Sequence, residues 1–291
     1  MTSMIHDIGY RHYEGRRLGR AYVMRSLYVH NLRAAFGLGR PARAKIMPFV
    51  LMGVMMLPAA GSLAAFAFAG QEEALIEYAA YAYIMQVIVA IFLATQAPVL
   101  ASREVRYHVI PLYFSRPVGH LDFVLAKAGA MATALFALMA TPITLLYFGG
   151  LVAKVPDPGE RFLEYLGGLA GCVLYALVLA AIGMVIAAFT PRRGFGVAAV
   201  IAVYLISTTF VEIVQEIAEA QTNFTLQGWI GLAAPFNLVD IVQVRLLGAD
   251  PSAGGIPPGT TGGLVALALC VLIVVGSIAV LYRRFRKAGL S

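Results

Sequence analysis

Residues 263–287 are GLVALALCVLIVVGSIAVLYRRFRK, a run of 20 residues without a charged side chain followed by a basic cluster. The hydrocarbon core of a bilayer is about 30 Å thick, and a helix rises about 1.5 Å per residue, so about 20 apolar residues cross it. A basic flank next to such a run marks its cytoplasmic end. The stretch therefore predicts a transmembrane helix over Gly263–Tyr282 that ends in the cytoplasm.

Five further apolar runs are long enough to cross the membrane, namely Ile46–Ala69, Tyr78–Ala101, Val124–Leu151, Phe162–Phe189 and Phe195–Val211. Composition agrees, because 60% of the 291 residues are hydrophobic and 13% are charged, against about 25% charged in a soluble domain. We expect an all-α integral membrane protein with six transmembrane helices. Its parts would be a cytoplasmic N-terminal segment (1–45), a membrane domain (46–282) and a basic cytoplasmic tail (283–291).

The stretch Trp229–Leu247 is a seventh candidate span, but it contains Pro235, Asp240 and Arg245. A charged residue at the centre of a span costs about 2.5–3.5 kcal/mol. A seventh span would also place the Arg283–Lys287 cluster outside. We therefore expect this stretch to be a partly buried or interfacial segment on the outer side.

The charges of the chain divide between the two sides of the predicted membrane domain. With six spans, 19 of the 22 Lys and Arg residues fall on the side of both termini, whereas 11 of the 15 Asp and Glu residues fall on the other. Basic residues mark the cytoplasmic side, so both termini are expected there. The net charge of +7 then belongs to membrane flanks, and no nucleic-acid partner is expected. The acidic face of Glu212, Glu216 and Glu219 is expected to be solvated outside.

Ionisable residues occur in the six predicted spans only near their ends, as Lys127 and Glu164. An ion-coupled secondary transporter needs charges at depth, and a membrane-embedded enzyme or cofactor-binding subunit needs buried reactive clusters. Both remain alternatives, although the spans lack these features. We expect no catalytic residue, metal site or cofactor on this chain. The polar side chains inside the spans are uncharged, and they include Gln86, Thr95, Gln96, Ser207 and Thr208.

None of the four lysines follows a glycine, since Lys45, Lys127, Lys154 and Lys287 come after Ala, Ala, Ala and Arg. The phosphate-binding Walker A loop requires Gly-Lys-Ser/Thr. The chain is therefore not expected to be an enzyme, and any ATP hydrolysis would take place in a separate subunit.

The predicted loop between the second and third spans carries the most distinctive pattern. Residues 102–127 are SREVRYHVIPLYFSRPVGHLDFVLAK, in which an apolar and aromatic group lies between arginines. Such a group on the cytoplasmic side is typical of a docking surface for a soluble partner.

This loop resembles the corresponding loop of the ABC-2 class of ABC-transporter permeases. The matching residues are Leu112, Tyr113, Ser115, Arg116, Pro117, Asp122, Phe123 and Lys127. Leu18–Phe36 is similar to the amphipathic connecting helix of that class, and Trp229–Leu247 to its outer re-entrant segment. The pair Gly119-His120 departs from the pattern, since the family usually has Ser or Thr followed by Arg.

The resemblance implies a permease subunit in the bacterial cytoplasmic (inner) membrane, a homodimer or a heterodimer with a paralogue, paired with two copies of a separate ATPase that binds ATP and Mg. It would export a small or amphipathic compound such as a drug, an antibiotic or a lipid. The implied ATPase-coupling residues are Arg103, Glu104, Arg106, Leu112, Tyr113, Ser115, Arg116 and Pro117. The implied pathway, between the two permease copies, includes Gln86, Thr95, Gln96, Ser207 and Thr208.

Overall fold

The computed structural model describes residues 15, 18–69, 75–107, 109–110, 113, 118–190, 192–252, 255, 257 and 259–290, and over these residues the fold is helical with no strand. The helices are α1 (Arg20–Ala35), α2 (Arg43–Ala69), α3 (Tyr81–Ile84), α4 (Gln86–Arg106), α6 (His120–Val152), α7 (Pro158–Phe189), α8 (Arg193–Ala220), α9 (Phe224–Ile230), η2 (Gly231–Ala233), α10 (Pro235–Leu247) and α11 (Gly259–Leu290).

Six of these helices, α2, α4, α6, α7, α8 and α11, are long and apolar enough to cross a membrane. They coincide with the six predicted runs, with two differences. The second run is broken at Met85, which separates the short α3 from α4. The fifth continues beyond Val211 to Ala220, because EIVQEIAEA is rich in good helix formers and extends the helix past its apolar part.

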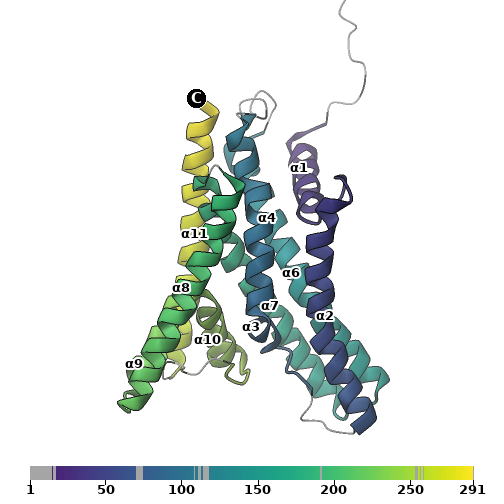
Figure 1. The fold of residues 1–291 in the computed structure, drawn as a ribbon, viewed down its shortest axis with the longest axis vertical. Coiled ribbons are helices and arrows are strands. Elements are labelled where there is room, and N and C mark those ends of the chain that lie inside the picture. The colour runs from purple at the N-terminus through teal and green to yellow at the C-terminus, as the bar shows by residue number, and fades with distance from the viewer. Residues whose placement is uncertain are drawn as a thin grey trace, which may run out of the picture.

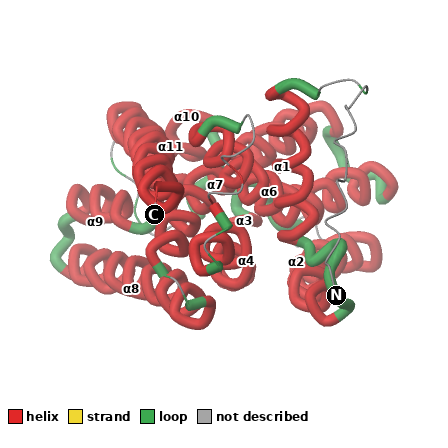
Figure 2. The backbone as a smooth tube through the Cα atoms, turned by 90° about the horizontal axis from the view of Figure 1, so that it is seen from above, coloured by secondary structure: helices red, strands yellow, loops and turns green. Residues whose placement is uncertain are grey.

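The long helices alternate in direction, so α1 and the end of α11 lie at the same end of the molecule (Figure 1). We call this end, where α2, α6 and α8 begin, the basic end, and the opposite one the acidic end. Helices α4 and α7 are central, because 61% of the apolar 18-residue stretch of each is buried inside the protein. The same share is 22% for α2 and 17% for α8 and α11. Figure 2 shows α8 and α11 on one side of this centre and α2 on the other. The exposed apolar faces of these outer helices are suited to contact with the acyl chains of lipids.

Two glycines in the first half of α7 allow close packing. A Cβ atom on Gly168 would lie 3.0 Å from the backbone of Tyr78, and one on Gly171 would lie 2.1 Å from the Gln243 side chain. Small residues allow helices to approach in this way. The neighbouring Gly167 faces open space, so the packing pair is Gly168 and Gly171.

Between α8 and α11 lies a bent pair of helices, α9–η2 and α10, whose axes turn by 119°. Ala234 is extended (φ −104°, ψ 132°) because Pro235 follows it and begins α10. Helix α10 packs against α7 and α11 and is buried throughout residues 236–243, including the polar Asn237, Asp240 and Gln243. The three glutamates Glu212, Glu216 and Glu219 of α8 are exposed, as the sequence predicts.

Candidate coupling surface and pathway

The predicted coupling residues are only partly covered by the structure. Leu112, Ser115, Arg116 and Pro117 lie outside the described residues. Arg103, Glu104 and Arg106 occupy the last turn of α4 at the basic end, where both arginines are exposed.

Glu104 faces the protein interior, where it pairs with Lys127 of α6. Lys127 is 1% exposed, and its ammonium also donates to the Leu100 carbonyl and, at 3.4 Å, to the Asn31 amide oxygen of α1. The ammonium lies 5.0 Å from the centre of the Phe123 ring. This lysine cluster, formed by Asn31, Leu100, Glu104 and Lys127, therefore joins α1, α4 and α6 at one point.

A second link holds α1 to the beginning of α6. The guanidinium of Arg20 donates from Nε and from a terminal nitrogen to the Asp122 carboxylate, at 2.5 and 2.8 Å. Asp122 also accepts the Gly119 backbone N–H at 3.3 Å and so caps the first turn of α6. The chain that leaves the loop is thus tied directly to the N-terminal helix.

Tyr113 is half-buried. Its ring centre lies 5.4 Å from that of Phe123, which in turn lies 5.3 Å edge-on to Phe285 of α11. The ring of Tyr113 therefore packs partly on the bundle, and its place in a docking surface stays a prediction.

The five predicted pathway residues lie on α4 and α8, which pack against each other. The hydroxyls of Thr95, Ser207 and Thr208 donate to carbonyls of their own helices at 2.9 to 3.0 Å. Gln96 is buried and donates to Thr95. The Gln86 amide oxygen is buried and accepts no hydrogen bond from the described residues.

The sequence analysis did not single out the buried polar side chains of α10, which are Asn237, Asp240 and Gln243. Asp240 is 1% exposed and accepts the Ser252 backbone N–H at 3.2 Å. Its charge was a reason to expect a partly buried or interfacial segment here in place of a seventh span. The spacing of Asn237, Asp240 and Gln243, at i, i+3 and i+6, was the signal that these side chains share one helical face.

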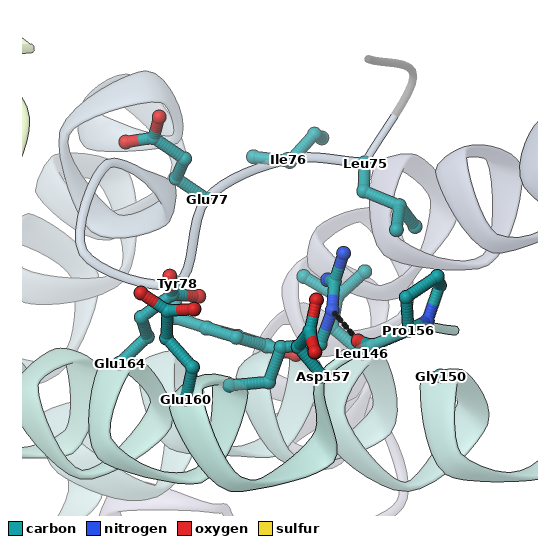
Figure 3. A pocket seen from close by; sticks show the side chains of 11 residues that line it. Leu75, Ile76, Glu77, Tyr78, Leu146, Gly150, Pro156, Asp157, Glu160 and Glu164 are labelled. Carbon is teal, nitrogen blue, oxygen red and sulfur yellow. Dashed lines mark hydrogen bonds between the residues drawn. The ribbon is translucent and has the colours of Figure 1, made fainter. Parts of the chain in front are cut away.

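The acidic end contains a cavity of about 500 Å³ between residues 75–78 and the start of α7. Figure 3 shows Glu160 and Glu164 of α7 pointing toward Tyr78, with Glu77 above them. A second cavity of about 380 Å³ shares Glu77, Tyr78, Glu160 and Glu164 with the first and adds Asp250. The pKa of Glu77 is raised by burial and by the nearby carboxyls of Asp250 and Glu164. The surroundings of this carboxyl therefore disfavour its charged form.

Glu77→Gln is expected to stabilise the protein at neutral pH. Because the folded-state pKa of Glu77 lies above its ordinary value of 4.5, the folded protein holds this proton more tightly, and stability is lost as pH rises from that value through the raised pKa. The measurement is the midpoint of thermal unfolding in detergent between pH 4.5 and 8. Glu216→Gln, an exposed change on α8, is the control, and an equal effect of both variants would contradict the assignment.

These features define a multi-pass membrane protein with six candidate spans, and within the described residues no three His, Cys, Asp or Glu side chains form a metal site. No protein-family model matches the chain, and no curated protein matches it.

Proposed function

We propose that the chain is the transmembrane subunit of an ATP-driven exporter of the ABC-2 class, working as a dimer with two copies of a separate ATPase. The observation that carries the proposal is the lysine cluster, supported by the Arg20–Asp122 link. These contacts join α1 to both helices that flank the 102–127 loop. A force applied to the loop would reach α4, α6 and α1 together.

In this proposal the basic end faces the cytoplasm of a bacterium, and both termini lie there. Helix α1 is the connecting helix at the inner surface, with Leu27, Asn31, Ala34 and Ala35 as its buried face. The bent pair α9–η2 and α10 is a re-entrant segment at the outer surface. The substrate, a small or amphipathic compound, passes between two copies along α4 and α8, which carry Gln86, Thr95, Gln96, Ser207 and Thr208.

The test is purification of the tagged protein from its native membrane in mild detergent. We expect a stoichiometric ATPase to accompany it and to hydrolyse ATP. The double variant Leu112→Ala/Arg116→Glu should lose most of this ATPase, because it removes an apolar contact and reverses a charge in the loop. The control Leu38→Ala/Arg192→Glu makes the same changes elsewhere at the basic end. Retention of the ATPase by the loop variant, or its equal loss from the control, would contradict the coupling assignment.

A second candidate is an ion-coupled transporter, which the buried Asp240 favours because coupling carboxylates lie at depth. The same purification separates the two. In the second case the protein would purify without an ATPase and, in vesicles, transport a solute only when a pH or sodium gradient is imposed. That result would establish the second candidate and overturn the first.

A further inference from the structure

Two adjoining cavities at the basic end, of about 940 and 350 Å³, share Arg40, Val99, Arg103 and Tyr107. The smaller one is also lined by Arg106 and Arg193. We name the region around these four arginines, Arg40, Arg103, Arg106 and Arg193, the arginine pocket.

The arginine pocket is assembled from three parts of the chain. Arg40 lies in the turn between α1 and α2, Arg103 and Arg106 lie in the last turn of α4, and Arg193 is the first residue of α8. Each of these places is the end of a helix apolar enough to cross the membrane. In a bilayer the pocket therefore lies at the level of the lipid headgroups.

The positive charge of the pocket is not balanced by the described part of the protein. The described part of the protein contains two ion pairs, Arg20–Asp122 and Lys127–Glu104, and neither includes an arginine of the pocket. Glu104 is the one described carboxylate that lines either cavity. That carboxylate is committed to Lys127. Arg40 is half-buried, and its pKa is lowered by this burial and by the positive charges of Arg103 and Arg193. A bound anion would relieve this repulsion.

We propose that the arginine pocket binds the phosphate group of an anionic phospholipid from the adjoining leaflet. Guanidinium groups donate paired hydrogen bonds that match phosphate oxygens, and basic pockets between transmembrane helices on the cytoplasmic side are suited to anionic headgroups. The inference does not depend on the chain working with an ATPase.

Apolar surface beside the arginines favours a lipid over a free anion. Val99 and Pro98 line the pocket, so part of its wall is apolar. The beginning of α2 exposes Ile46, Met47 and Val50, and the beginning of α8 exposes Phe195. Acyl chains that continue from a bound phosphate into the membrane would meet these side chains, whereas a free phosphate would gain nothing from them.

The test is native mass spectrometry of the purified protein in detergent, titrated with phosphatidylglycerol or with phosphatidylcholine. We expect one phosphatidylglycerol per chain to bind about tenfold more tightly than phosphatidylcholine. Both lipids carry the phosphate, but the choline cation of phosphatidylcholine would be repelled by the four arginines. Arg40→Gln and, separately, Arg103→Gln should each weaken phosphatidylglycerol about tenfold. Arg283→Gln, which removes one exposed charge from α11 at the same end, should leave it unchanged.

Three results would overturn the proposal. The first is equal binding of the two lipids, and the second is an equal loss in Arg283→Gln, which would mean a general charge effect. The third is displacement of phosphatidylglycerol by millimolar inorganic phosphate, which would mean a site for small anions. Folding of each variant is checked with a thiol-reactive dye, because Cys172 and Cys270 are both free and buried. The exposed Arg103 keeps the test valid if the Arg40 variant does not fold.

Discussion

Lys127→Met is expected to lower the free energy of unfolding by about 3–5 kcal/mol, the cost of removing one partner from a buried ion pair. The change leaves the Glu104 carboxylate without its cation and the Leu100 carbonyl and Asn31 amide oxygen without their donor. The chain has two cysteines, both buried, so a thiol-reactive fluorogenic dye reports global unfolding directly. We expect a large decrease in the midpoint of thermal unfolding measured in this way.

The double variant Lys127→Met/Glu104→Gln separates the ion pair from simple packing. Removing both charges avoids the uncompensated carboxylate, so most of the lost stability should return. Lys45→Met, at an exposed lysine on α2, is the matched control and should be close to neutral. A Lys127→Met protein as stable as the Lys45→Met protein would show that the lysine cluster does not hold α1, α4 and α6 together.

Gly37→Ala is expected to give the second large loss of stability. Gly37 joins α1 to α2 with φ +67°, a conformation that costs an alanine about 1–2 kcal/mol. A Cβ atom here would also lie 2.3 Å from the Ala44 carbonyl oxygen and 2.6 Å from its carbon. Because these are backbone atoms, the turn itself must shift, which adds about 1–3 kcal/mol of overpacking.

Gly39→Ala is the control for this variant. Gly39 has φ +80°, but nothing lies within 4 Å of a Cβ atom built on it. Its alanine variant therefore meets only the conformational cost, and its unfolding midpoint should lie between those of the original protein and Gly37→Ala. Equal midpoints for the two variants would mean that the Ala44 backbone moves away from the new Cβ atom without a loss of stability.

The apolar runs predicted the six long helices because the length of a span follows from the thickness of hydrocarbon. The direction of individual side chains depended on partners far along the chain. Glu104 was expected at a docking surface, yet it turns inward because Lys127 lies opposite on the next long helix. The Trp229–Leu247 stretch was expected to be partly buried or interfacial, yet α10 packs against α7 and α11 and is buried throughout residues 236–243, Asp240 included. The sequence pattern of a single helix does not contain the position of such a partner on another helix.

The hydrogen bonds between α1 and α6 also set an order of events during synthesis. They join residues 96 to 105 positions apart, from Asn31–Lys127 to Tyr28–Thr133. At about 5–20 residues per second, a ribosome makes the partners of α1 on the order of 5–20 s after α1 itself. Helix α1 therefore leaves the ribosome first but docks late, after α6 has been made. Docking of α1 onto α6 can therefore take place only after the third span has been synthesised.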